Sequence, residues 1–239
     1  MVRTMLAADS WRRDPRAGWF VFALGALGTF IVVVLFTMMW PAFAQLDAWI
    51  SAGIRSTRTP ALTVVANGLT LIASARVVMP ITLVLIVWMA IRRNWAAAVY
   101  IFMTVAVGWF LGNDVIKNII RRPRPSGVNL TPVSGDFSMP SGHSIAIFLL
   151  LTTLCVIVML NLPTGRHLKR WLAAVAAVII ISVGLARVYL GVHWFGDVLG
   201  AWLLGGAWWA FTTATYFGSV TEERRVARRT SGATGQLSE

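Results

Sequence analysis

The stretch WFVFALGALGTFIVVVLFTMMW, from Trp19 to Trp40, decides the fold because it carries no charged residue from end to end. An α-helix needs about 20 apolar residues to cross the hydrocarbon core of a bilayer. The apolar core of a cleaved signal peptide is shorter, at about 7–15 residues. We therefore interpret this stretch as a retained transmembrane helix and expect lipid to be the main solvent of the protein.

The composition of the whole chain agrees with a membrane protein. Hydrophobic residues make up 57% of the chain and charged residues 13%, whereas soluble domains carry about 25% charged residues. Further charge-free runs follow the first one, at Val77–Ile91, Asn94–Asn113, Ser144–Gly165, Trp171–Ala186 and Val198–Thr221. We expect the shorter runs to extend into their flanks. The sequence therefore predicts an all-α fold, a six-helix transmembrane bundle.

The segment Ala44 to Arg58 follows the first span and is amphipathic. Its apolar residues recur at helical spacing, at Leu46, Trp49, Ile50 and Ile54. This spacing places them on one face of a helix. We expect an interfacial amphipathic helix on the outer surface of the membrane.

The net charge of +12 is of the kind that nucleic-acid-binding proteins carry, but its distribution argues against that class. Most basic residues stand in short clusters between apolar runs, as helix flanks do. With six spans, the clusters before the first span, between the second and third, between the fourth and fifth, and after the sixth share one side. The positive-inside rule makes that side the cytoplasm. We expect a multi-pass cell-membrane protein with both termini in the cytoplasm and no nucleic acid partner.

The spans divide the chain into three parts. Residues 1–18 form a cytoplasmic N-terminal segment, and residues 19–220 form the six-span membrane domain. Residues 221–239 form a basic cytoplasmic tail, which is polar, rich in small residues and expected to be partly disordered.

One basic cluster opposes the charge rule, because it falls between the third and fourth spans on the outer side. It holds Lys117, Arg121, Arg122 and Arg124, followed by Pro125. Arginine offers a planar fork of donors that matches phosphate oxygens, and lysine offers a point charge. A clamp for phosphate is one interpretation. A flank that binds lipid headgroups is the other, and the cluster alone favours it.

The string Pro140-Ser141-Gly142-His143 opens the fourth predicted helix. Serine is a preferred N-cap, and glycine lets a ligand approach the backbone. Free N–H groups at a helix N-terminus bind anions. His143 would then stand in the first turn, beside a bound anion, although an ordinary cap with an interfacial histidine is the simpler alternative.

A third polar cluster runs from Arg187 to Asp197 and contains His193. His193 and Asp197 are four residues apart, so at the start of a helix the carboxylate would reach the imidazole. A carboxylate on one ring nitrogen leaves the other as a lone pair, as a nucleophilic histidine requires. Ionisable groups near a membrane interior are costly and usually functional. We therefore favour a catalytic role over a structural hydrogen bond.

Taken in order, three motifs resemble the signature of the type 2 phosphatidic acid phosphatase (PAP2) superfamily. They are Lys117-x6-Arg124-Pro125, Pro140-Ser141-Gly142-His143 and Arg187-x5-His193-x3-Asp197. The resemblance implies a PAP2-like catalytic membrane domain over residues 19–220. One departure is Ala186, where the family usually has serine before the arginine of the third motif.

The resemblance also implies a role for each motif residue. His193 would attack phosphorus and form a phosphohistidine, Asp197 would orient it, and His143 would protonate the leaving oxygen. The phosphate oxygens would be held by Lys117, Arg124, Arg187, the Ser141 hydroxyl and the Gly142 backbone N–H. Arg121 and Arg122 remain as spare cations, expected to meet lipid headgroups or a second phosphate.

The expected activity is that of a membrane lipid phosphate or diphosphate phosphatase whose active site faces outward. It needs no metal and no cofactor, since cations balance the phosphoryl charge. The candidate substrates are undecaprenyl diphosphate, phosphatidylglycerophosphate and phosphatidic acid. A lipid phosphotransferase on the same scaffold and a non-catalytic lipid-binding or transport protein stay open as alternatives.

Overall fold

The computed structural model describes the backbone of residues 15–132, 135–161 and 165–236, and side chains from 16 to 220 within those ranges. The regular elements of these ranges are all helical, and one isolated β-bridge joins Pro123 to Phe137. The helices are α2 (Pro15–Met39), α3 (Pro41–Ser56), α4 (Pro60–Ile72), α5 (Ala75–Ile91), α6 (Trp95–Ile101), η1 (Phe102–Val107), α7 (Gly108–Phe110), η2 (Leu111–Ile116), α8 (Lys117–Ile120), α9 (Gly142–Asn161), α10 (Arg166–Tyr189) and α11 (Phe195–Gln236). The predicted all-α class is confirmed.

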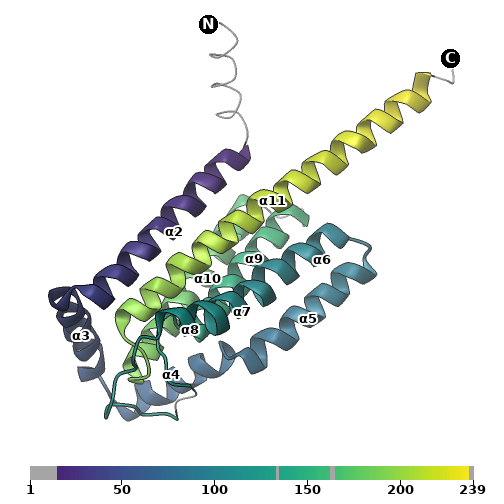
Figure 1. Ribbon diagram of the computed structural model, residues 1–239. Coiled ribbons are helices and arrows are strands. Elements are labelled where there is room, and N and C mark those ends of the chain that lie inside the picture. The colour runs from purple at the N-terminus through teal and green to yellow at the C-terminus, as the bar shows by residue number, and fades with distance from the viewer. Residues whose placement is uncertain (1–14, 133–134, 162–164, 237–239) are drawn as a thin grey trace, which may run out of the picture.

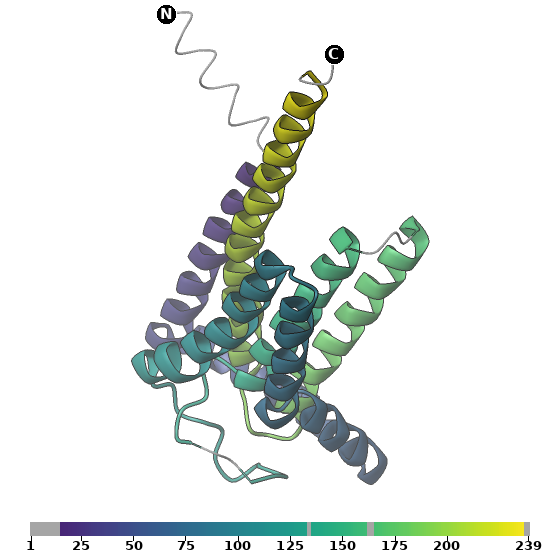
Figure 2. The same cartoon turned by 90° about the vertical axis from the view of Figure 1, so that its right-hand side faces the viewer.

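The long helices form one bundle (Figure 1). The first long helix, α2, packs along α11, and α9 packs against both α10 and α11. The shorter α3 lies at the end of the bundle where α2 ends and α11 begins, and the loop between α8 and α9 lies at that same end (Figure 2). Since α11 reaches Gln236, the structure has helix in most of the segment for which the sequence predicts a partly disordered tail.

Five segments of the described chain are long and apolar enough to cross a membrane: Arg16–Met39, Pro60–Ile91, Trp95–Ile120, Gly142–Asn161 and Arg166–Tyr189. They correspond to the first five predicted spans, and the second is lengthened because α4 joins α5. The sixth predicted span lies in α11, which is not among the five. Its tryptophan, glycine and threonine residues lower the mean hydropathy of that helix. The structure thus supports a multi-pass membrane protein, and the count of six spans is not confirmed.

The predicted amphipathic helix after the first span is present as α3, with bounds close to those expected. Trp49 is 74% exposed, whereas Asp47 and Ser51 are 3% and 0% exposed. Trp49 on the apolar face therefore points away from the protein, Ile54 on the same face packs at its edge against a buried cluster, and the polar face of α3 is packed into the protein. This arrangement is the reverse of that in a helix of a water-soluble protein.

The third span is continuous but not uniformly α-helical, because it contains the two π-helical segments η1 and η2. A π turn accommodates one extra residue per turn, and such turns recur at functional sites. The second segment ends immediately before Lys117, so the predicted first motif follows a wide turn.

Candidate active site

The loop after α8 positions the first motif. The helix ends at Arg121, whose left-handed φ of 54° turns the chain out of the helix. Lys117 stays in the helix, where its Nζ donates to Oδ1 of Asn113 at 2.9 Å. Arg124 lies in the loop and donates from Nη1 to the carbonyl of Val192 at 2.8 Å, which ties the first motif to the third.

The second motif lies at the start of α9, against the start of α11. The backbone N–H of Ser141 donates to the carbonyl of Asp197 at 3.1 Å. Gly142 packs so closely on Asn113 that a Cβ at this position would collide with the Asn113 amide oxygen. The two contacts hold the start of α9 between the first and third motifs.

The third motif lies in the turn between α10 and α11. Nδ1 of His193 is 3.3 Å from Oδ2 of Asp197, so the predicted contact between imidazole and carboxylate is present. The same Oδ2 accepts the backbone N–H of Trp194 at 2.8 Å. His193 precedes α11 rather than belonging to it, and the carboxylate reaches it from the first turn of the helix.

Arg187 lies in the last turn of α10, and only 7% of it is exposed. Its Nη1 donates to Oγ1 of Thr70 at 3.4 Å, whereas its buried Nε has no hydrogen-bond partner among the described residues. A buried donor without a partner costs free energy of about 1–3 kcal/mol. An anion in the adjacent cavity would remove that cost.

These residues surround one cavity of about 610 Å³. The motif residues in its wall are Lys117, Arg124, Gly142, His143, Arg187 and His193. Asp197 stands behind His193, and Ser141 is fully buried with its hydroxyl bonded by Ser144 at 3.0 Å. Of the residues predicted to touch phosphate, the structure therefore brings all but Ser141 to the wall.

The cations in the cavity wall change the pKa of His193, the candidate nucleophile. Burial, followed by the charges of Arg187, Arg124 and Lys117, holds the pKa of the His193 imidazole well below its ordinary value. His193 is therefore neutral over the physiological pH range, as an attacking nitrogen requires. Burial also lowers the pKa of the Arg124 guanidinium, an effect that Asp197 and Asp136 oppose.

Arg122 is not the spare cation that the sequence suggests. It is 6% exposed, with Nη1 2.7 Å from Oδ1 of Asp197 and Nη2 2.6 Å from Oδ2 of Asp47. Contact with lipid headgroups or a second phosphate is wrong for this residue because both carboxylates occupy its donors. Arg121 is exposed and bonds the carbonyl of Asn118, so its expected contact with headgroups stays a prediction.

The residues that sequence reasoning missed lie on α3. Oδ1 of Asp47 accepts the backbone N–H of Gly196 at 2.8 Å, and the Ser51 hydroxyl accepts that of Phe195 at 2.9 Å. The sequence contains only a slight signal for them: Asp47 and Ser51 are polar, stand four residues apart, and lie on a helix whose opposite face is apolar. That spacing places both side chains on one face of α3.

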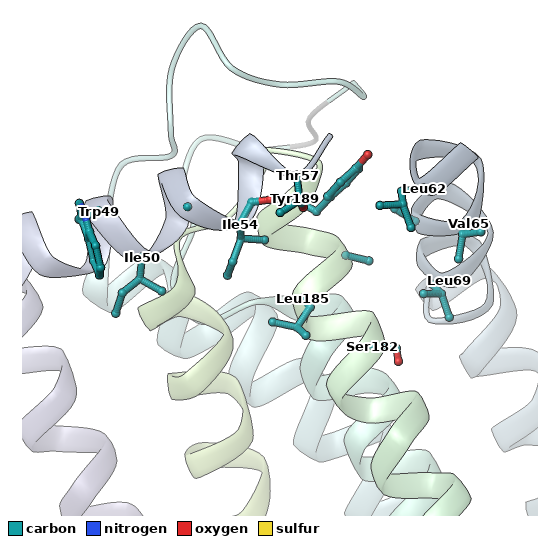
Figure 3. A pocket seen from close by; sticks show the side chains of 13 residues that line it. Trp49, Ile50, Ile54, Thr57, Leu62, Val65, Leu69, Ser182, Leu185 and Tyr189 are labelled. Atoms are coloured by element: carbon teal, nitrogen blue, oxygen red, sulfur yellow. Dashed lines mark hydrogen bonds between the residues drawn. The ribbon is translucent and has the colours of Figure 1, made fainter. Parts of the chain in front are cut away.

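A second hollow lies near the site but has a different character. It is an apolar groove of about 590 Å³ between α3, α4 and α10, and Figure 3 shows Trp49, Ile50, Leu69 and Leu185 along it. Its walls carry no charged side chain among the described residues. Ala186 faces this groove, so a serine hydroxyl at that position would not reach the cavity beside Arg187.

Comparison with known proteins gives the family. The model of the PAP2 superfamily matches residues 93–220, more than half of the chain, and the match includes all three motifs. The chain belongs to the PAP2 superfamily. It is therefore a membrane phosphatase, a hydrolase of phosphate esters.

The PAP2 assignment agrees with individual relatives. Phosphatidylglycerophosphatase B of Bacillus subtilis is 29% identical over 180 residues, which cover 75% of this chain and 88% of that protein. Undecaprenyl-diphosphatase of Sulfolobus acidocaldarius is 33% identical over 137 residues, 55% of this chain and 59% of that protein. The crystal structure of a transmembrane PAP2 type phosphatidylglycerolphosphate phosphatase from Bacillus subtilis superposes with a TM-score of 0.74 at 27% identity, covering 81% of this chain and 94% of that chain.

Proposed function

We propose that this PAP2 phosphatase removes phosphate from a membrane lipid through a phosphohistidine formed on Nε2 of His193. One observation carries the proposal. His193 is buried, with Asp197 on Nδ1, while its Nε2 lies 3.4 Å from Nη1 of Arg124. A nitrogen in that position meets phosphorus whenever Arg124 holds the phosphate oxygens.

The proposed reaction has two steps. In the first, the Nε2 lone pair forms a bond to phosphorus, the bond from phosphorus to the lipid oxygen breaks, and His143 gives that oxygen a proton. In the second, water attacks phosphorus while His143 takes up its proton, the P–N bond breaks, and inorganic phosphate leaves. Asp197 holds Nδ1–H and thereby stabilises the positive charge of the phosphorylated ring.

The proposed phosphate site consists of Lys117, Arg124 and Arg187, with the backbone N–H groups at the start of α9. Three cations neutralise the charge of the transferred group, and a helix N-terminus adds donors. Ser141 would set the start of α9 rather than touch phosphate, because its side chain lies behind the wall.

The proposed placement in the membrane keeps six spans, with α11 as the sixth. This helix packs along α2, whose apolar residues would share the bilayer with it. Both termini would then lie in the cytoplasm with the basic flanks, and the cavity end of the bundle, with α3, would face outward. We retain residues 1–18, 19–220 and 221–239 as cytoplasmic segment, catalytic domain and basic tail.

The proposed substrate class is a lipid that carries two phosphate groups. Beyond the three cations at His193, the cavity wall includes Arg76 at the start of α5, whose exposed side chain forms no hydrogen bond or ion pair with another described residue. A fourth cation favours a second phosphate on the leaving group. Undecaprenyl diphosphate and phosphatidylglycerophosphate meet this condition, and phosphatidic acid, with one phosphate, does not.

The test is phosphate release from these three lipids in detergent with EDTA present, by the wild type and by His193→Ala. We expect release from the wild type and none from the variant, with the two-phosphate lipids turned over faster. Brief incubation with a ³²P-labelled lipid should trap acid-labile label on the wild type only. Release that survives in a folded His193→Ala enzyme would overturn the mechanism, and transfer of label to another lipid instead of water would indicate a phosphotransferase.

A further inference from the structure

The start of α11 is held from outside by α3. The first backbone N–H groups of a helix lack partners within it and need acceptors. Here the N–H of Phe195 is accepted by Ser51 at 2.9 Å and that of Gly196 by Asp47 at 2.8 Å. These two side chains of α3 thus cap α11, the helix that carries Asp197. They stand 144 and 149 residues before the residues that they cap.

Arg122 completes the connection between α3 and the carboxylate. Its two terminal nitrogens contact Asp47 and Asp197 at 2.6 Å and 2.7 Å, so one guanidinium joins the cap to the partner of His193. The guanidinium also lies over the ring of Trp194, with 5.7 Å between its Cζ and the ring centroid. Arginine can bridge two carboxylates in this way because its donors form a rigid planar fork.

The packing around this connection leaves little space for another arrangement. A Cβ at position 196 would lie 2.7 Å from Oδ2 of Asp47 and 3.2 Å from Nη1 of Arg122. Arg122 and Asp47 are 6% and 3% exposed, and Asp197 and Ser51 are fully buried. The contacts are therefore shielded from water. Dissolved salt should weaken them little, because salt screens exposed ion pairs far more than buried ones.

We propose that Asp47 and Arg122 are positioning residues of the reaction, which hold the Asp197 carboxylate in register with Nδ1 of His193 and make α3 a working part of the active site. Neither residue reaches the cavity wall, so neither touches phosphate. Their effect passes through Asp197. This inference rests on the proposed function for its kinetic readout, but not for its spectroscopic one.

The charges of this connection give the two residues opposite effects. The titratable and charged groups that face His193 are Asp197 from α11, Arg187 from α10, His143 from α9, Lys117 from α8 and Arg124 from the following loop. Behind Asp197 stand Arg122 and then Asp47. Without the charge of Arg122, the carboxylate of Asp197 acts more strongly on the imidazole, and the pKa of His193 rises. Without the charge of Asp47, Arg122 is uncompensated, and the pKa of His193 falls.

The experiment compares Arg122→Gln, Arg122→Lys and Asp47→Asn with a matched control, Arg121→Gln. Arg121 is the neighbouring arginine, but it is exposed and bonds only the carbonyl of Asn118. We expect kcat to fall about 100-fold in Arg122→Gln, the loss typical of a slight misplacement of a reacting group, while KM stays within about twofold because the phosphate contacts are intact. The control should keep the kcat and the pH profile of the wild type, because Arg121 does not contact Asp197.

The pH profile separates positioning from a general loss of structure. The acid limb of kcat/KM should move to higher pH in Arg122→Gln and to lower pH in Asp47→Asn. In Arg122→Lys the positive charge remains, so the acid limb of the pH profile should stay at the pH of the wild type. Only the value of kcat should fall, because lysine lacks the planar fork that contacts both carboxylates. Loss of activity in proportion to the melting temperature, with no movement of the limb in any variant, would overturn the proposal.

A spectroscopic measurement gives a readout without substrate. The chain has three histidines, so the ¹⁵N spectrum of selectively labelled protein resolves the two nitrogens of His193 once His193→Gln has assigned them. We expect the Nδ1 shift to change in Arg122→Gln and Asp47→Asn and to stay fixed in Arg121→Gln. Asparagine is nearly isosteric with aspartate, so folded Asp47→Asn should keep the local packing. An unchanged Nδ1 chemical shift in that variant would show that α3 does not act on the pair of His193 and Asp197, whatever lipid the enzyme hydrolyses.

Discussion

Nη1 of Arg124 lies 3.4 Å from Nε2 of His193, while Asp197 holds the other ring nitrogen. The two ring nitrogens thus have different neighbours, a cation on one side and a carboxylate on the other. In the proposed mechanism, this asymmetry makes Nε2 the nitrogen that attacks phosphorus. The surrounding cations also favour the neutral form of the His193 ring in the free enzyme.

The pH dependence of the free enzyme follows from that environment. In the proposed mechanism the imidazole of His193 attacks only when neutral, and its pKa is held well below the ordinary value of about 6.5. As the pH falls through 6.5, roughly the value for a free histidine, His193 should therefore stay neutral, and kcat/KM should decline only at lower pH. A titration of the ¹⁵N-labelled histidines checks the assignment, because the substrate phosphate has its own pKa. A His193 signal that titrates at its ordinary pH would contradict the prediction.

Gly142→Ala tests the contact between α9 and the first motif. The added Cβ would collide with the amide oxygen of Asn113, which is also the acceptor for Lys117. We expect Asn113 and Lys117 to be displaced together, raising KM about tenfold and destabilising the fold by about 1–3 kcal/mol. Gly68→Ala on α4 is the control, because nothing lies within 4 Å of its added Cβ. Equal KM values for the two variants would exclude the contact as a determinant of phosphate binding.

Arg76→Gln tests the second-phosphate assignment. If Arg76 holds the phosphate on the leaving group, its loss should raise KM for phosphatidylglycerophosphate and undecaprenyl diphosphate about tenfold to a hundredfold, the effect of about 1.5–3 kcal/mol for a hydrogen bond to a charged group. The KM for phosphatidic acid should be nearly unchanged. The measurement is steady-state release of phosphate from each lipid in mixed micelles. A uniform rise for all three lipids would assign Arg76 to general attraction of anions instead.

Ala186→Ser tests whether the departure from the usual third motif matters. The side chain of Ala186 is 5% exposed and lies in the apolar cluster with Tyr189 and Leu190, on the groove side of α10. A hydroxyl there faces away from the cavity, so we expect kcat and KM within about twofold of the wild type, and a loss of about 1 kcal/mol of stability from burying a hydroxyl. A gain of tenfold or more in kcat/KM would show that the hydroxyl reaches phosphate.

Local spacing is what made the sequence informative. His193 and Asp197 are four residues apart in sequence, and the motif around Gly142 combines a cap with a glycine, so both motifs could be predicted to lie at one anion site. The five apolar spans were equally accessible, because lipid selects length and composition. The sequence was less decisive for α11, in which glycine, threonine and tryptophan dilute the apolar residues.

The role of Arg122 could not be predicted, because it depends on contacts distant in sequence. Its two carboxylate partners each lie 75 residues away, on opposite sides along the chain. Within its own segment, Arg122 looks the same as Arg121, and a left-handed residue at Arg121 is what sends the two side chains in different directions. Only the tertiary fold distinguishes the buried arginine from the exposed one.

The π-helical segments of the third span make the direction in which Lys117 points depend on helix type. Each π turn holds one residue more than an α turn, and one residue corresponds to about 100° of rotation about the helix axis. If all six residues of Leu111–Ile116 adopted an α-helix instead, Lys117 would be carried about 100° around the axis relative to the start of the span. Lys117 would then leave the wall that it shares with Arg187, although every charged residue of the motifs would still be present in the chain. The direction in which Lys117 points is therefore set partly by the type of helix that precedes it, a property that the identity of the motif residues does not record.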